Sequence, residues 1–132
     1  MLTSVELCTG AGGQALGLEQ AGFDHLACVE IDSHAVGTLR LNRPTWNVFE
    51  QDLRHWKGSR WKGVDLFAAG LPCPPFSKAG KQLGERDERN LFTDAVHHID
   101  EIRPKAVMIE NVRGILDAVF DDFRGRFKDQ VE

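Results

Sequence analysis

The chain has 132 residues, 42% of them hydrophobic and 27% charged, with a formal net charge of −4, which is the size of one domain and the composition of an ordinary soluble globular protein. No apolar run approaches the roughly 20 residues that cross a bilayer, and the N-terminal MLTSVELCTG lacks the basic and long apolar regions of a signal peptide. The acidic balance argues against attraction of nucleic acid to the whole surface, although a local basic patch is compatible with it.

The apolar pattern predicts alternating strands and helices, and we expect residues 1–132 to form a single domain. In chain order it predicts a strand at 5–8, a helix at 12–21, a strand at 26–30, a helix at 32–41, strands at 46–49 and 64–69, a helix at 91–102, a strand at 106–109 and a helix at 115–128. Gly22 suits the end of the first helix, and Asp32 with Ser33 suits the cap of the second. The polar residues 77–90 are expected to form a mobile loop.

Strands that alternate with helices predict an α/β fold, a doubly wound parallel sheet of the Rossmann-like kind. Ligands of such folds gather at the C-terminal ends of the strands. The notable polar features follow the predicted strands: Thr9-Gly10, Glu30, Asp52, Cys73 and Glu110. We therefore expect these features to share one edge of the sheet.

The run Gly10-Ala11-Gly12-Gly13 follows the first strand and opens the first helix. Glycines there allow a tight turn close to a ligand, and the helix N-terminus suits a carboxylate or phosphate. Glu30 ends the second strand, where a carboxylate can accept hydrogen bonds from ribose hydroxyls. Asp52 could accept a bond from an adenine amino group. A nicotinamide dinucleotide enzyme would look the same, and so would a structural turn with solvated surface acids.

Cys73 lies in the stretch GLPCPPFS, between Pro72 and Pro74-Pro75. Each proline fixes φ near −65°, so the loop is stiff and the direction of the thiol is set. This arrangement favours a nucleophile, because attack requires a narrow range of geometry. The alternative is a small buried hydrophobic residue in a proline turn.

The three cysteines Cys8, Cys28 and Cys73 show neither a CxxC pair nor zinc-like spacing. An odd number without such pairing predicts neither a disulfide framework nor a metal site, and it favours a cytoplasmic location.

Glu110-Asn111 follows the fifth strand, which can neighbour the fourth strand in a doubly wound sheet. Cys73 and Glu110 would then emerge side by side. A partly dehydrated carboxylic acid beside a thiol has a raised pKa and can donate a proton. The alternative is an acid that caps a loop.

Taken together, ELCTGAGG, VEID, QDL, GLPCPPFS with the following AGK, NLF and ENV resemble the DNA (cytosine-5)-methyltransferase family over about residues 4–116. The pair PCPPFS and ENV sets the nicotinamide alternative aside. The resemblance implies the fold of methyltransferases that use S-adenosyl-L-methionine, incomplete here at its C-terminal end.

The resemblance also implies a mechanism. The Cys73 thiolate adds to carbon 6 of a cytosine flipped out of double-stranded DNA, and Glu110 donates a proton or hydrogen bond at ring N3. Carbon 5 then takes the methyl group of S-adenosyl-L-methionine. Asn111 would shape the Glu110 turn, and Pro72 would lie between cofactor and cytosine.

Further site residues are implied only by the resemblance, in two groups. The cofactor-binding group is Cys8, Thr9, Gly10, Ala11, Gly12, Gly13, Glu30, Ile31, Asp52, Leu53, Gly70 and Leu91. The DNA-binding group, in and beside the polar loop, is Ser77, Lys78, Lys81, Arg86 and Arg89.

The sequence departs from the family at Cys8, where an aromatic residue is usual, and at Glu6, where Asp is usual. The family continues with an arginine-bearing segment, a target-recognition region and a C-terminal segment, none of which occurs in these 132 residues. The uniformly apolar strand at 106–109 suggests cover on both faces and a partner on both edges. We therefore expect a truncated chain or the first subunit of a split enzyme, completed by a C-terminal part or a second polypeptide. The alternative is an inactive fragment that binds S-adenosyl-L-methionine or another protein.

Overall fold

The computed structural model describes residues 1–71, 91–111, 113, 125–126 and 128–129. Its elements in chain order are β1 (Thr3–Leu7), α1 (Gly13–Gln20), β2 (Asp24–Glu30), α2 (Ser33–Asn42), β3 (Val48–Glu50), the short 3₁₀ helix η1 (Ser59–Trp61), β4 (Leu66–Gly70), α3 (Phe92–Ile102) and β5 (Ala106–Glu110). None of the helices within these ranges is long and apolar enough to cross a membrane. The expected helix at 115–128 lies largely outside the described residues.

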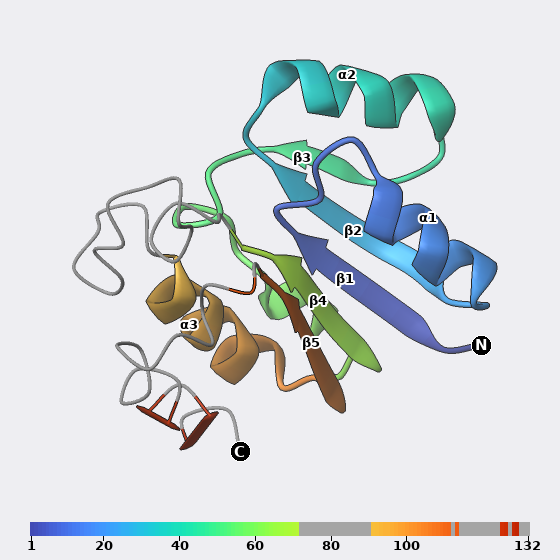
Figure 1. The fold of residues 1–132 in the computed structure, drawn as a ribbon. Helices are drawn as coiled ribbons and strands as arrows, with labels where there is room; N and C mark the ends of the chain where they lie inside the picture. The colour runs from blue at the N-terminus through green and yellow to red at the C-terminus, as the bar shows by residue number, and fades with distance from the viewer. Residues whose placement is uncertain (72–90, 112, 114–124, 127, 130–132) are drawn as a thin grey trace.

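The five described strands form one parallel sheet in the order β3-β2-β1-β4-β5 (Figure 1). This order reverses direction at β1, as in doubly wound folds, so the predicted fold class is confirmed. The prediction that the fourth and fifth strands are neighbours is also confirmed, because β4 pairs with β5 from Leu66–Ala106 to Gly70–Glu110.

Two helical layers cover the sheet. On one face Leu18 of α1 packs against Leu66 and Ala68 of β4. On the other face α3 packs into the main core, whose members each expose less than a tenth of their surface. That core consists of Val5, Leu7, Ala27, Val29, Leu53, Trp56, Val64, Phe67, Ala69, Leu71, Phe92, Ala95, Ile99 and Ile102. Alternate residues of β4 thus face opposite layers, with Leu66 and Ala68 on one side and Phe67 and Ala69 on the other, as the period of a strand requires.

Short-range interactions end α1 and begin α2 where the sequence predicts. Gly22 has a φ of 95°, and the N–H groups of Gly22 and Phe23 donate to the carbonyls of Glu19 and Leu18, both at 3.0 Å. This is the paired bonding of a Schellman motif, which favours glycine. The Asp32 carboxylate accepts from the N–H groups of His34 at 2.8 Å and Ala35 at 3.0 Å, so it caps α2.

β5 differs from the prediction of cover on both faces. Val107 and Ile109 pack against the main core, whereas Ala106, Met108 and Glu110 are exposed, Met108 to 37%. Among the described residues only one face of β5 is covered, and its only strand partner is β4. A run of apolar residues predicts that a strand is buried, but it does not predict which segment of the protein packs over each face.

Candidate functional site

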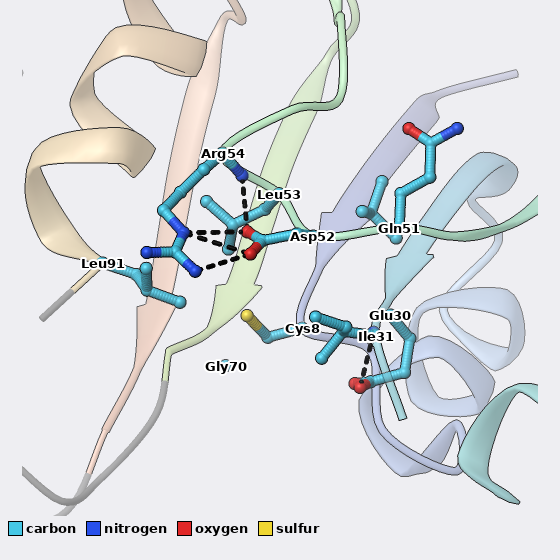
Figure 2. A pocket seen from close by; sticks show the side chains of 10 residues that line it. Cys8, Glu30, Ile31, Gln51, Asp52, Leu53, Arg54, Gly70 and Leu91 are labelled. Atoms are coloured by element: carbon cyan, nitrogen blue, oxygen red, sulfur yellow. Dashed lines mark hydrogen bonds and ion pairs between the residues drawn. The ribbon is translucent and has the colours of Figure 1, made fainter. Parts of the chain in front are cut away.

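An open pocket of about 700 Å³ lies at the C-terminal ends of β1, β2 and β4 (Figure 2). Its volume lies in the range of small-molecule sites. The lining residues are Cys8, Val29, Glu30, Ile31, Gln51, Asp52, Leu53, Arg54, Gly70 and Leu91. Segments far apart in the sequence therefore meet at the edge of the sheet where the sequence analysis expects the site.

The lining includes seven of the residues that the resemblance assigns to the cofactor, and they are Cys8, Glu30, Ile31, Asp52, Leu53, Gly70 and Leu91. The residues of the glycine turn, 9–13, are not part of the lining. Val29, Gln51 and Arg54 were not predicted as site residues. Gln51 stands in the motif QDL, so its place in that motif was a signal that could have identified it.

The turn after β1 has the backbone conformation that its glycines make possible. Gly10 and Gly12 have φ values of 61° and 105°, and a Cβ on Gly12 would lie 2.8 Å from Leu39 Cδ2. Cys8 also has a positive φ, 55°, which is uncommon for a residue with a side chain and costs conformational energy. The turn is therefore a strained, closely packed connection between β1 and α1.

Glu30 binds the two loops that flank the pocket. Its Oε1 accepts from the N–H of Gly10 at 2.8 Å, and its Oε2 accepts from the N–H groups of Ile31 at 2.9 Å and Asp32 at 2.8 Å. A carboxylate can accept about four hydrogen bonds, so Oε1 keeps capacity for a ligand hydroxyl. In this structure Glu30 holds the glycine turn beside the loop after β2.

Asp52 is engaged by its neighbour Arg54. The carboxylate accepts from the Arg54 backbone N–H at 2.9 Å, from Nη2 at 2.6 Å and from Nε at 3.1 Å. These charge-assisted bonds lower the pKa of Asp52 to about 2. Asp52 therefore faces the pocket as an ionised carboxylate that can only accept hydrogen bonds.

Two of the three cysteines are poor nucleophiles. Burial, together with nearby acids, raises the pKa of the thiols of Cys8 and Cys28 to about 12. Because the thiolate is the reactive form, neither side chain is suited to attack near neutral pH. Cys73, the predicted nucleophile, lies outside the described residues.

The ends of β4 and β5 place Glu110 beside the chain that leads to Cys73. Gly70 and Glu110 are register partners, and Glu110 Oε2 lies 3.3 Å from the position that a Cβ on Gly70 would take. Asn111 Nδ2 donates to the carbonyl of Leu71 at 3.3 Å. Glu110 and Asn111 thus lie against the end of β4, and Gly70 leaves room for the carboxyl group.

The remaining predicted site residues fall outside the described part of the chain. They are Pro72 and Cys73 of the catalytic group and Ser77, Lys78, Lys81, Arg86 and Arg89 of the DNA-binding group. Their roles stay predictions.

Similarity to known proteins agrees with the class of protein that the fold and the pocket indicate. The strand order and the pocket place the chain in the class of doubly wound α/β domains with the fold of S-adenosylmethionine-dependent methyltransferases. Within that class it belongs to the C-5 cytosine-specific DNA methylase family, whose sequence profile matches residues 2–129. The expected family is therefore confirmed.

Several relatives share most of this chain. It is 59% identical over 128 residues to the type II methyltransferase M.NgoMIV of Neisseria gonorrhoeae, covering 97% of this chain and 41% of that protein. It is 47% identical over 133 residues to M.NaeI of Lentzea aerocolonigenes, covering 98% of this chain and 32% of the other.

Solved structures give the same result. A protein described as a DNA modification methyltransferase encoded within an E. coli prophage superimposes with a TM-score of 0.83 at 29% identity, over 99% of this chain and 38% of its own. A mutant of Spodoptera frugiperda DNMT2 superimposes with a TM-score of 0.75 at 25% identity, over 99% of this chain and 40% of its own. The chain spans less than half the length of each of these four proteins.

Proposed function

We propose that this chain is the cofactor-binding and catalytic part of an enzyme that transfers a methyl group from S-adenosyl-L-methionine to carbon 5 of cytosine in DNA. The observation that carries the proposal is the register of β4 and β5, because it sets Glu110 against the strand that leads into GLPCPPFS. Membership of the C-5 cytosine-specific DNA methylase family supports the same chemistry.

The residues of the pocket fit an adenosine-type ligand. Glu30 keeps one acceptor position on Oε1 for a ribose hydroxyl, and the ionised Asp52 can accept from an exocyclic amino group. Ile31, which is 64% exposed, offers apolar surface for a purine ring, and Leu53, which is 4% exposed, also lines the pocket. When it is bound, S-adenosyl-L-methionine supplies an electrophilic methyl group on a sulfonium centre.

The chain's own residues activate the cytosine. The Cys73 thiolate forms a bond to carbon 6, while Glu110 donates a proton or hydrogen bond at N3, so that negative charge does not build up on the ring. Carbon 5, now enamine-like, forms a bond to the methyl group as the bond between that methyl group and the sulfonium sulfur breaks, and S-adenosyl-L-homocysteine leaves. Loss of the carbon 5 proton and cleavage of the carbon–sulfur bond restore the aromatic ring and release Cys73. Asn111 supports this step by fixing the Glu110 turn to Leu71.

Access to a stacked cytosine requires extrusion of the base from double-stranded DNA. The predicted contacts of Ser77, Lys78, Lys81, Arg86 and Arg89 with the DNA backbone belong to this step. We further propose that a C-terminal part or a second polypeptide completes the domain. Among the described residues the face of β5 at Ala106 and Met108 is exposed, which supports this proposal, because apolar strand faces are normally covered. A cytoplasmic location stays a prediction from the cysteine pattern.

Transfer of a labelled methyl group to DNA tests the proposal. We expect Cys73→Ala to abolish transfer while binding of S-adenosyl-L-homocysteine is retained. Cys28→Ala is the matched control, because its buried thiol has a raised pKa and it should leave transfer intact. The assay uses the chain both alone and with the C-terminal part of a relative, and we expect transfer only in the second case.

A trapping experiment separates the covalent mechanism from transfer by another route. In DNA that carries 5-fluorocytosine, the substituent on carbon 5 cannot leave as a proton, so the adduct with Cys73 should accumulate. Transfer that persists in Cys73→Ala, or an adduct that forms equally in that variant, would overturn the assignment of the nucleophile. Binding without any transfer in the completed protein would favour the alternative of a binding module.

A further inference from the structure

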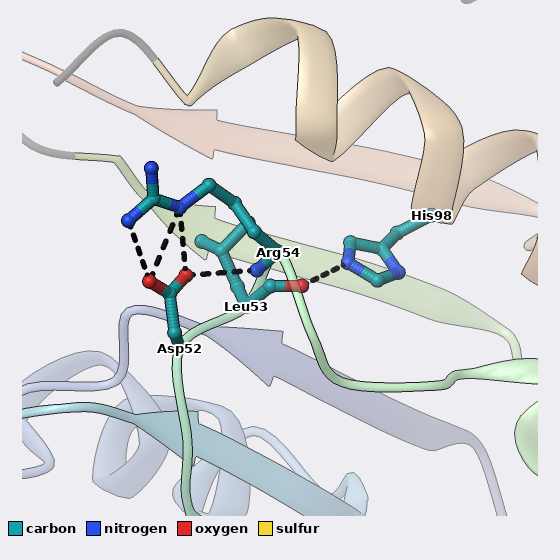
Figure 3. Close-up of polar contacts among 4 residues, drawn as sticks. All are labelled: Asp52, Leu53, Arg54 and His98. Atoms are coloured by element: carbon teal, nitrogen blue, oxygen red, sulfur yellow. Dashed lines mark hydrogen bonds and ion pairs between the residues drawn. The ribbon is translucent and has the colours of Figure 1, made fainter. Parts of the chain in front are cut away.

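Residues 51–54, between β3 and η1, form one wall of the pocket and are held by two contacts that the proposed function does not use (Figure 3). One contact joins the side chains of Asp52 and Arg54. The other joins the backbone of Leu53 to the side chain of His98, which is 45 residues away in the sequence. We refer to residues 51–54 as the wall segment.

The Arg54 guanidinium binds the Asp52 carboxylate through two donor nitrogens, a bidentate arrangement that we call the fork. Nη2 donates to Oδ2 at 2.6 Å, Nε lies 3.1 Å from both oxygens, and the Arg54 backbone N–H donates to Oδ1 at 2.9 Å. A fork with two donors fixes the plane of a carboxylate, which a single point charge does not. Three N–H groups thus leave about one acceptor direction of Asp52 for a ligand.

His98 fixes the backbone next to this carboxylate. Its Nε2 lies 2.6 Å from the Leu53 carbonyl oxygen, and because a carbonyl only accepts, Nε2 carries the hydrogen. His98 is buried on α3, with its ring 5.4 Å from that of Trp56. The wall segment is therefore attached to a helix that is packed into the main core.

We propose that Arg54 and His98 are positioning residues that make the pocket selective for a purine with an amino group at position 6 over a purine with a carbonyl oxygen there. The inference rests on the proposed function, because it takes the adenosine part of the cofactor to lie against the wall segment. An amino group can donate to the held carboxylate. A 6-oxo group would set one acceptor against another.

The low pKa of Asp52, about 2, supports this selectivity, because a protonated carboxyl could donate to a 6-oxo group. Without the fork the carboxylate is free to rotate and to meet either ligand through water. Without the His98 bond the Leu53 carbonyl is free to move, and the carboxylate moves with it. We expect both changes to reduce discrimination between the two purines.

The test compares S-adenosyl-L-homocysteine with S-inosyl-L-homocysteine by titration calorimetry, in the longest natural form of the chain. We expect the adenosyl ligand to bind about tenfold to a hundredfold more tightly, as for a hydrogen bond to a charged group. Arg54→Lys keeps the charge and loses the fork, and it should bring the ratio of the two affinities close to one. His98→Phe should lower the ratio, and His98→Gln, which keeps an N–H donor, should restore it.

Arg43→Lys is the matched control. Arg43 forms the same kind of fork with Glu19, through Nε at 3.1 Å and Nη2 at 2.9 Å, and neither residue lines the pocket. The ratio of affinities should not change in this variant. If Arg54→Lys does not fold, Arg54→Gln replaces it, and circular dichroism checks both.

The outcomes separate the two proposals. A wild-type protein that binds neither ligand would overturn the proposed cofactor pocket and this inference with it. A wild-type protein that binds both ligands equally would overturn the selectivity alone and leave the pocket standing. An unchanged ratio in Arg54→Lys, or a ratio in His98→Gln as low as in His98→Phe, would show that these side chains serve folding only.

Discussion

A buried pair of titratable groups on the α1 face of the sheet makes stability depend on pH in a predictable way. Glu6 of β1 exposes only 1% of its surface and His25 of β2 only 6%. Glu6 Oε1 lies 3.9 Å from His25 Nε2. His25 Nδ1 lies 2.6 Å from Ser4 Oγ. Neither oxygen of the Glu6 carboxyl has a hydrogen-bond partner in the part of the chain that the structure describes.

Burial disfavours the charged form of both groups. It raises the pKa of Glu6 from 4.5 to about 8 and lowers the pKa of His25 from 6.5 to about 4. Both side chains are therefore neutral near pH 6, and their 3.9 Å contact is not an ion pair there.

The sign of the effect follows from proton uptake. Between pH 6.5 and 8 the unfolded chain has lost the Glu6 proton, whereas the folded chain keeps it until the pH approaches about 8. The free energy of unfolding therefore falls by at most about 1.4 kcal/mol per pH unit, or about 1–2 kcal/mol over this window. Between pH 4.5 and 6.5 the opposite effect of His25 cancels that of Glu6. The thiols of Cys8 and Cys28 ionise only above their ordinary pKa of 9.0, so among the described residues with a shifted pKa, Glu6 dominates the slope in this window.

Urea denaturation at half-unit steps from pH 6 to 8, followed by circular dichroism, measures this slope. We expect Glu6→Gln, which cannot ionise and has the same shape, to remove the decline. Glu19→Gln is the control: Glu19 is only partly buried and its pKa is lowered, so that variant should shift the free energy of unfolding without changing the slope between pH 6.5 and 8. A wild-type protein whose stability is flat or rises over the window, or a Glu6→Gln variant with the same decline, would refute the reasoning.

Three further changes test the fold and the pocket. Asp32→Ala removes the cap of α2 and should lower the free energy of unfolding by about 1 kcal/mol, and Asp32→Ser should recover most of it in urea denaturation. Gly58→Ala would place a Cβ 2.6 Å from Ile102 Cδ1, which should cost about 1–3 kcal/mol. Ile102→Val in the same chain should offset part of that cost, and strict additivity of the two changes would contradict the contact. Glu30→Gln puts an amide N–H2 against backbone N–H groups such as that of Gly10, so it should weaken binding of S-adenosyl-L-homocysteine about tenfold or more in calorimetry; unchanged affinity would show that Glu30 does not serve the pocket.

The strands could be predicted from the sequence because their apolar runs are short, regular and separated by turn residues. The third strand shows the limit of that signal, since it was expected at 46–49 and occurs at Val48–Glu50. Trp46 belongs to the turn before it, where its N–H donates to the Arg43 carbonyl at 3.1 Å and its ring lies 5.2 Å from that of His25. An aromatic residue next to a strand raises strand propensity whether or not it joins the sheet.

The site could be predicted in residue type and in place, but not in its contacts. The rule that polar groups follow the strands correctly placed Glu30 and Asp52 at the pocket. The bond between Leu53 and His98 spans 45 residues, and no short motif signals such a pairing. The burial of Glu6 beside His25 could likewise not be predicted from the sequence, because an acid in a strand normally faces water.

The contacts of Glu30 and Asp52 show that both pocket acids are held in place by the protein's own N–H groups. Glu30 accepts three backbone N–H groups, and Asp52 accepts three N–H groups of Arg54. Both carboxylates are thus oriented by the protein before a ligand arrives, and each keeps little spare acceptor capacity. The entropy of fixing these side chains is lost on folding rather than on binding, which favours affinity. We therefore expect the pocket to disfavour ligands that present an acceptor where the proposed adenosine ligand presents its amino group.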